Sequence, residues 1–471
     1  MTGRIRFRLV AACAAAGIVL LMAAVPAAQA TTSTHYTGTT SDGGAWIADV
    51  PSPFNGTVLI YSHGFGPLLA ADAPDGTTQQ ALLNMGYALA GSSYDPGGSW
   101  WALGSALRDQ FETLAAVKAD LATPPSHVIA LGTSMGGLIS ALEDEHSNGQ
   151  IDAALTTCGI VAGGIQLNNY QLDGEYTVSK LPVPGSTTST PPIKLVNFTG
   201  PPDGLVTGQQ LDGLAQQFQA TPQGRARLAL AMAFMNVSTW APGEQMPATN
   251  DFQTQELEQF AVEFTPPFST MDFVEFGRPY IELASGGNGS WTAGVNFESL
   301  LERSPYKPEV VSLYRAAGLN LHRDLQTLTR GANIAADPKA IRWLKQTSVP
   351  TGRLQVPELD LHTISDQLVP VQQENYYART VRRAGAGDLL RQAFIQRQLH
   401  CNFTPAELVA GVLAIQHRVN TGHWDSVADP AALEASANGL GLGPAAFIPY
   451  QPQRLSGNNG PFEHDLGGLR P

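Results

Sequence analysis

Cysteine and charged side chains are both scarce in this sequence. Only three cysteines and 14% charged residues occur among 471 positions. No group of His, Cys and Asp residues has the spacing of metal ligands, and no pair of carboxylates stands out as the acid and base of a glycosidase. We therefore expect neither a metal-dependent nor a glycoside-cleaving mechanism, and we expect no cofactor.

Long hydrophobic runs are absent beyond the N-terminus. Within residues 1–30, three arginines (Arg4, Arg6 and Arg8) precede an apolar stretch, and Ala28-Gln29-Ala30 resembles a cleavage site. This pattern is typical of a secretory signal peptide. No later stretch is long and apolar enough to span a bilayer, and no cysteine follows the cleavage site as a lipid anchor. We expect a secreted, extracellular protein without a membrane span, beginning at Thr31.

Basic residues are fewer than acidic ones. The chain has 27 Lys and Arg against 40 Asp and Glu, and three of the 27 lie in the predicted signal peptide. The mature chain then has 24 basic and 40 acidic residues, a net charge of −16. Such a surface disfavours nucleic acid and anionic membranes as partners. The sequence carries no signal for a particular oligomeric state.

The most informative stretch is residues 127–146. An apolar run at 128–131 ends in Gly132-Thr133-Ser134-Met135-Gly136-Gly137, and a helical pattern follows. Strand, sharp turn and helix around G-x-S-x-G are the context of a nucleophile elbow. Side chains at Gly132 and Gly136 would collide with the neighbouring strand and helix. The alternative is a glycine-rich loop with a solvated serine, because 48 glycines make the bare pattern weak.

Strand-like and helix-like segments alternate on both sides of this motif. The expected strands are 45–50, 57–62, 87–92, 128–131, 151–161, 358–362 and 389–398, and the main helices between them are 79–85, 108–121 and 371–384. This order predicts an α/β fold with a mostly parallel sheet flanked by helices. Ligands in such sheets bind at the carboxyl ends of the strands.

The alternation stops between the two halves of this pattern. We expect a core formed by residues 31–162 and 349–438, with a large, mainly helical lid insertion at 163–348 packed over the strand ends. The alternative is that the insertion is an independent second domain. Residues 439–471 are expected to form a loop-like tail.

A serine nucleophile needs a base, which a carboxylate orients. In this class of fold the expected chain order is serine, acid, histidine. Asp366 follows the strand at 358–362 and precedes a helix, which is the position expected of the acid. Asp360 is the competing acid, but it lies inside the strand. Asp366 could alternatively be an ordinary helix cap.

Ten histidines are available as the base. His400 lies at the end of the strand at 389–398, so one helix and one strand separate it from Asp366. His362 comes too early in the chain for the expected order. His423 is the second choice. These positions favour His400.

The tetrahedral intermediate of acyl transfer needs two N–H donors directed at its oxygen. Met135, directly after the serine, is expected to supply one, and Phe65, in the loop His63-Gly64-Phe65-Gly66, the other. The imidazole of His63 is expected to fix this loop by a hydrogen bond.

Aromatic side chains are the candidates for substrate contacts. Trp100 and Trp101 follow the strand at 87–92, at the same sheet edge as Ser134, and could either line an aromatic or acyl pocket or pack beneath the lid. The same two interpretations apply to the insertion aromatics Phe260, Phe264, Phe268, Phe273 and Phe276.

Two cysteines, Cys158 and Cys401, remain after the predicted signal peptide is removed. An even pair in an oxidising compartment favours a disulfide, and two unrelated buried thiols are the alternative.

Four segments taken together resemble the α/β-hydrolase superfamily: residues 63–66, 132–137, 365–370 and His400-Cys401. The resemblance implies a Ser-His-Asp triad of Ser134, His400 and Asp366, no metal and an acyl-enzyme intermediate. The His-Cys pair also resembles secreted tannase and feruloyl-esterase relatives, in which cysteines beside the catalytic Ser and His are bonded. Here Thr133 precedes Ser134, so a bridge would have to use Cys158.

The sequence thus predicts a secreted serine hydrolase that cleaves small-molecule or polymeric carboxylic esters. A peptidase, an amidase or an acyltransferase with the same triad is the first alternative. A catalytically silent α/β-hydrolase that acts as an extracellular binding protein is the second.

Overall fold

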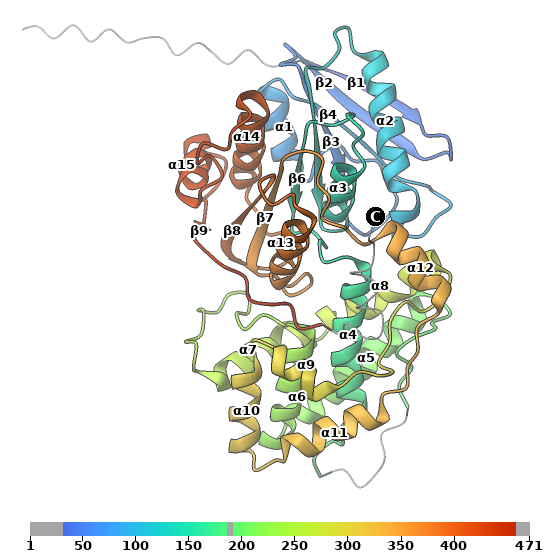
Figure 1. The fold of residues 1–471 in the computed structure, drawn as a ribbon, viewed down its shortest axis with the longest axis vertical. Coiled ribbons are helices and arrows are strands. Elements are labelled where there is room, and N and C mark those ends of the chain that lie inside the picture. The colour runs from blue at the N-terminus through green and yellow to red at the C-terminus, as the bar shows by residue number, and fades with distance from the viewer. Residues whose placement is uncertain (1–31, 186–191, 458–471) are drawn as a thin grey trace, which may run out of the picture.

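The computed structural model describes residues 32–185 and 192–457, so the predicted signal peptide lies outside the described residues. One sheet organises the fold, with strand order β1-β2-β4-β3-β5-β6-β7-β8-β9 (Figure 1). The strands are β1 (Thr32–Thr39), β2 (Ala45–Ser52), β3 (Thr57–Ser62), β4 (Ala88–Ser92), β5 (His127–Thr133), β6 (Ala153–Thr157), β7 (Glu358–Ser365), β8 (Leu390–Gln398) and β9 (Phe447–Ile448).

The six strands from β4 to β8 in this order run parallel, and antiparallel strands occur only at the two edges of the described sheet. The central strand β5 is buried from Val128 to Gly132. A parallel strand that is covered on both faces has apolar residues at nearly every position. This continuous apolar run made the strand recognisable in the sequence. The predicted α/β fold with a mostly parallel sheet is confirmed.

Helices cover both faces of the sheet (Figure 1). Helices α1 (Gly76–Asn84), α14 (Pro405–Thr421) and α15 (Pro430–Leu440) lie on one face, and α2 (Ala106–Asp120), α3 (Met135–Glu145) and α13 (Gln372–Ala384) lie on the other. Successive side chains of β5 point to opposite faces of the sheet, so Ile129 packs toward α14 and Val128 packs toward α2.

The segment between β6 and β7 is helical in the residues described and forms the lower body in Figure 1. Its helices are α4 (Gly164–Lys180), α5 (Pro201–Gln219), α6 (Pro222–Met235), α7 (Phe252–Phe264), α8 (Thr270–Ser285), α9 (Phe297–Arg303), α10 (Lys307–Ala316), α11 (Leu321–Gly331) and α12 (Pro338–Thr347). One buried cluster contains Met135 and Leu138 of α3 together with Met232 and Phe234 of α6. The insertion therefore shares a continuous hydrophobic core with the helix that follows Ser134.

Helices α4 and α8 are joined by a buried ion pair. The guanidinium of Arg278 on α8 binds the carboxylate of Glu175 on α4 and lies 3.5 Å from Glu275. All three side chains are fully buried or nearly so. Removing one partner of such a pair leaves an uncompensated charge in the core, so the pair fixes the relative position of the two helices.

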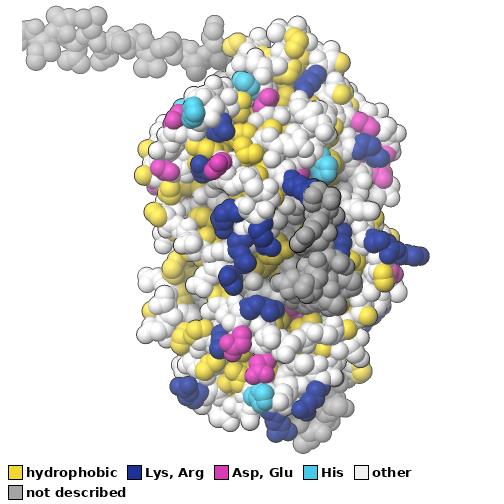
Figure 2. All heavy atoms as spheres, in the orientation of Figure 1, with side chains coloured by type: hydrophobic (Ala, Val, Ile, Leu, Met, Phe, Trp, Pro, Cys, Tyr) yellow, Lys and Arg dark blue, Asp and Glu magenta, His cyan; other side chains and the backbone are white. Residues whose placement is uncertain are grey.

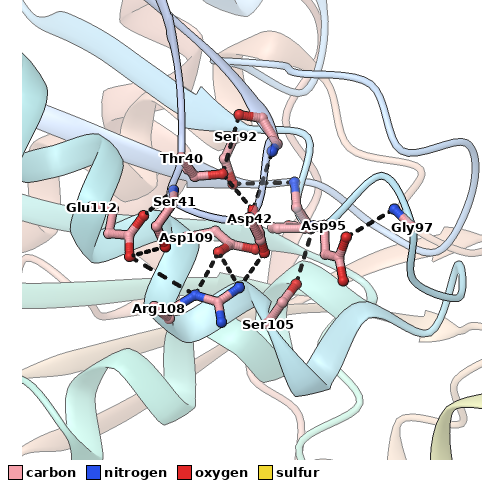
Figure 3. Close-up of polar contacts among 12 residues, drawn as sticks. Thr40, Ser41, Asp42, Ser92, Asp95, Gly97, Ser105, Arg108, Asp109 and Glu112 are labelled. Carbon is pink, nitrogen blue, oxygen red and sulfur yellow. Dashed lines mark hydrogen bonds and ion pairs between the residues drawn. The ribbon is translucent and has the colours of Figure 1, made fainter.

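A polar network at the protein surface fixes the loop between β4 and α2 (Figure 3). Arg108 at the start of α2 binds Asp42 in the β1–β2 turn and also Asp109. Within the loop, the backbone N–H of Asp95 donates to Ser105 Oγ at 3.1 Å. These contacts position the segment that carries Trp100 and Trp101.

Three edge features differ from the expectation or were not anticipated. Residues 32–39 form β1, which pairs with β2 along its whole length. The segment after 438 was expected to be loop-like, but it contains β9, where Phe447 pairs with Ile395 of β8. Further on, Ser456 exchanges two hydrogen bonds of 2.7 Å with Asn236 at the end of α6. A two-residue strand has no periodicity to detect, which is why the tail carried no signal.

In the described parts of the chain, no helix has both the length and the apolarity needed to cross a bilayer. The surface is not uniformly acidic. Figure 2 shows Lys and Arg side chains gathered near the middle of one face, in the region of α13. Arg379, Arg382 and Arg383 of α13 and Arg454 are all exposed, and the three other arginines lower the pKa of Arg379, although burial is the largest cause.

Candidate active site

Ser134 lies at the tip of the turn between β5 and α3. Its backbone has φ 60° and ψ −119°, a strained combination for a residue with a side chain. A Cβ atom at Gly132 would lie 2.0 Å from the carbonyl oxygen of Gly136, and one at Gly136 would lie 1.8 Å from that of Ser62. Only glycine fits at both positions, as the nucleophile-elbow pattern predicts.

Three side chains from separate parts of the chain meet at this turn. His400 Nε2 lies 2.8 Å from Ser134 Oγ, and His400 Nδ1 lies 2.6 Å from Asp366 Oδ2. Asp366 follows β7 and is buried, whereas the His400 side chain, after β8, is 16% exposed. The predicted serine, acid and base are therefore brought together as a hydrogen-bonded relay.

Backbone groups and a second histidine hold the Asp366 carboxylate. Its Oδ1 accepts hydrogen bonds from the N–H groups of Leu368 (2.9 Å) and Val369 (2.8 Å). Burial by itself would raise the pKa of Asp366. The charge of His400 and hydrogen bonds from His362 and His400 outweigh it and hold the pKa well below its usual range. Asp366 is therefore ionised and can orient the imidazole.

His362 lies directly behind the acid. Its Nε2 is 3.5 Å from Asp366 Oδ2 and 2.8 Å from the carbonyl oxygen of Val369, and its Nδ1 is 2.8 Å from Glu374 Oε1. Both ring nitrogens thus face acceptors, which favours the doubly protonated ring. Burial lowers the pKa of His362, but hydrogen bonds to Asp366 and Glu374 prevail and raise it to about 10. This contact could not be predicted from the sequence, because Glu374 comes from a different element.

The competing candidates lie elsewhere. Asp360 is buried inside β7, where it accepts hydrogen bonds from Thr156 and Gln392. His423 is exposed and lines a separate surface pocket with Arg391 and Arg418. Neither side chain makes a described contact with Ser134.

The loop after β3 lies against Ser134. A Cβ atom at Gly64 would be 3.2 Å from Ser134 Cβ. His63 Nδ1 bonds the carbonyl oxygen of Gly64 at 2.8 Å, and its ring stacks on Tyr94 at 4.3 Å, so His63 fixes the loop as expected. Neither Phe65 nor Met135 donates its backbone N–H to any described acceptor. Among the described residues both N–H groups therefore lack an acceptor; Met135 directly follows Ser134, and Phe65 lines the same cavity as Ser134.

A disulfide adjoins the relay. The sulfurs of Cys158 and Cys401 are 1.99 Å apart, and the Cys401 sulfur lies 3.2 Å from His400 Nε2. Cys158 directly follows Thr157, whose carbonyl oxygen accepts the N–H of Ser134 at 3.0 Å. The bridge therefore ties the histidine loop to the strand beside the serine. The sulfurs of Cys158 and Cys401 and a ring nitrogen of His400 lie close enough together to bind one metal ion. Sulfurs that are bonded to each other, however, are not thiolates and do not serve as metal ligands.

A cavity of about 210 Å³ opens on Ser134 and His400. Apolar side chains from the sheet loops, α4 and α8 form most of its wall, among them Phe65, Trp101, Ile160, Leu167, Phe273, Val274, Ile281, Leu368 and Val369. Trp101 lines this cavity. Trp100 does not, and instead stacks on Tyr280 of α8 at 4.7 Å.

Some aromatic residues of the insertion line the cavity, and others pack within the insertion, so both interpretations of these residues apply. Phe273 lines the cavity, Phe276 packs on Trp100, and Phe264 belongs to the buried core. Phe260 is partly buried against that core, and Phe268 is exposed beside Phe273.

The strand order and the serine at the tip of β5 define an α/β-hydrolase fold. It is 25% identical over 430 residues to an o-phthalyl amidase from Xanthobacter agilis, covering 88% of this chain and 93% of the amidase. No protein-family model matches the chain. The fold and this similarity support hydrolase activity.

Solved structures are more distant. Feruloyl esterase B from Aspergillus oryzae matches with a TM-score of 0.43 and 12% identity, over 83% of this chain and 82% of the esterase. An acylaminoacyl peptidase bound to a chloromethyl ketone matches 83% of this chain with a TM-score of 0.39 and 9% identity. This chain spans 41% of the peptidase's length.

Proposed function

We propose that this protein is a secreted serine hydrolase that cleaves carboxylic esters through an acyl-enzyme intermediate. The observation that carries the proposal is the relay of Ser134, His400 and Asp366 opening onto a mostly apolar cavity. Secretion rests on the signal-peptide pattern of residues 1–30.

In this mechanism His400 removes the proton of Ser134 as Oγ attacks the substrate carbonyl. The N–H groups of Phe65 and Met135 stabilise the oxyanion that forms. His400 then gives its proton to the leaving group, and the carbonyl re-forms as an ester of Ser134. Water, activated by the same imidazole, releases the acid and restores the serine. Asp366 stabilises the imidazolium in both halves of the cycle.

Amide cleavage is the second candidate, and similarity to an o-phthalyl amidase favours it. The same relay serves both bonds, since His400 can protonate an amine as it can an alkoxide. A matched pair of substrates decides between them: a p-nitrophenyl ester and a p-nitroanilide with the same acyl group. The proposal expects the ester to have the higher kcat/KM. Turnover confined to the anilide would establish an amidase instead.

Labelling tests whether the protein is an enzyme at all. A fluorophosphonate should form an adduct on Ser134 of the folded mature chain, located by peptide mass spectrometry. A folded chain that forms no adduct and turns over no ester would be a binding protein. N-terminal sequencing of exported protein should begin at Thr31 and tests secretion separately.

A further inference from the structure

Two helices of the insertion supply one side of the cavity. Leu167 lies on α4, and Phe273, Val274, Gly277 and Ile281 lie along one face of α8. These residues carry no hydrogen-bonding side chain. Apart from Ser134 and His400, Gln171 of α4 is the polar side chain in the wall.

Gln171 lies one helical turn beyond Leu167, so both side chains face the cavity. Its residue is 8% exposed. Its amide makes no hydrogen bond, ion pair or ring contact with any residue in the described parts of the chain. Neither its oxygen nor its nitrogen is among the fully enclosed polar atoms without a partner, so the amide faces the open space of the cavity.

The position of Gln171 on α4 is well fixed. One turn further along the same helix, Glu175 binds Arg278 of α8 in the buried ion pair. The amide is therefore held against the cavity by two helices that are locked together. A fixed, unpartnered amide in an apolar wall has the arrangement of a recognition group.

We propose that Gln171 determines specificity by hydrogen-bonding a neutral polar group on the acyl part of the substrate. A primary amide has both donors and an acceptor, so a carboxamide on the substrate is its best partner. Apart from His400 of the relay, the residues that line the cavity have no ionisable side chains, so neither a carboxylate nor an ammonium group finds a counter-charge there. The substrate class is a neutral, mainly apolar acyl group bearing a carboxamide. This inference rests on the proposed hydrolase function.

The enzyme would discriminate between acyl groups through the water that each one displaces from Gln171. In the free enzyme, water in the cavity can satisfy the amide of Gln171. A purely apolar acyl group displaces that water and leaves the amide unpaired. Sites that hydrogen-bond their substrate reject analogues lacking the group far more strongly than they reject a missing methylene.

The test is a panel of p-nitrophenyl benzoates carrying, at the meta or para position, hydrogen, carboxamide, acetyl or carboxylate. Acetyl matches carboxamide in size but donates no hydrogen bond, so it is the isosteric control. One carboxamide isomer should exceed its acetyl counterpart in kcat/KM by about tenfold or more. Carboxylates should be the poorest substrates.

Gln171→Leu should reduce that ratio to near one, and Gln171→Glu should abolish it as well. Fluorophosphonate titration of Ser134 counts the intact active sites in each variant, so misfolding is separated from altered specificity. A ratio unchanged in Gln171→Leu, or no preference for any carboxamide in the wild type, overturns the assignment of Gln171. Absence of both adduct and ester turnover overturns the proposed function and the substrate class with it.

Discussion

Ser134 Oγ and His400 Nε2 lie 2.8 Å apart, although 266 positions of the chain separate the two residues. The distance is that of a hydrogen bond, so the hydroxyl proton can pass directly to the imidazole. Nothing between them has to move before attack begins.

Ser134→Ala should therefore reduce kcat/KM by about 10⁵-fold or more, as removal of a triad nucleophile does. The melting temperature should change little, because alanine keeps Cβ and removes one hydroxyl. Ester hydrolysis and thermal unfolding of the same preparation check both statements. Substantial residual activity would show that another residue is the nucleophile.

His400→Ala should be inactivating to a similar extent, because it removes the base. His423→Ala is the matched control, since His423 is exposed in a different pocket. Steady-state kinetics of the two variants decide the assignment. An inactive His423→Ala variant beside an active His400→Ala variant would reverse it.

The parts of the site that the sequence predicted are those with local signatures. Strand, turn and helix around Ser134 lie within twenty positions, and the turn at Asp366 follows directly on β7. His400 was found by chain order. Glycine spacing and strand ends are properties of short segments, and a sequence displays them directly.

The parts that the sequence did not predict depend on contacts between distant segments. His362 was set aside because of its position, yet it contacts Asp366 because α13 brings Glu374 against β7. Gln171 lies in α4, which was not anticipated, in an insertion whose helices pack mainly on each other. Tertiary packing alone determines which of their faces becomes a cavity wall.

Gly64→Ala should slow the chemical step. The added Cβ would be 3.2 Å from Ser134 Cβ and 3.3 Å from the carbonyl oxygen of Thr133, so the loop carrying the Phe65 N–H has to shift by a few tenths of an ångström. Displacing one oxyanion donor costs up to about 3 kcal/mol, and we expect kcat to fall about 10–100-fold with a smaller change in KM.

The control for this substitution is Gly76→Ala. Nothing lies within 4 Å of a Cβ at Gly76, and its backbone is not in the positive-φ region. Gly76→Ala should retain wild-type kcat. Equal kcat values for both variants would show that the loop does not supply an oxyanion donor.

Reduction of the Cys158–Cys401 bridge should lower both stability and activity. The bridge spans 243 positions, for which loop entropy predicts a loss of at most about 5.5 kcal/mol of unfolding free energy. Activity should fall because Cys401 directly follows His400 and the bridge restrains its loop. Urea unfolding and ester hydrolysis with and without reductant measure the two effects. Cys158→Ser/Cys401→Ser should be insensitive to reductant, and two free thiols in the native wild type would contradict the bridge.

The pair of Asp366 and His362 makes stability depend on pH in a predictable direction. The pKa of His362 is about 10 in the folded protein, against about 6.5 when unfolded. Its contribution is therefore complete below about pH 6.5 and is lost as the pH rises through 10. The pKa of Asp366 is lowered by folding, so its contribution is present above about pH 4 and is lost as the pH falls through the folded value.

We expect the free energy of unfolding to fall between pH 6 and pH 9.5, with His362 contributing at most about 1.4 kcal/mol per pH unit. Urea unfolding at the two pH values should show a smaller fall in His362→Gln, whose side chain does not titrate. Glu374→Gln should make the fall smaller and end it at lower pH, because it removes a carboxylate that raises the pKa of folded His362. Equal falls in the wild type and in His362→Gln would show that His362 is not a cation in the folded protein.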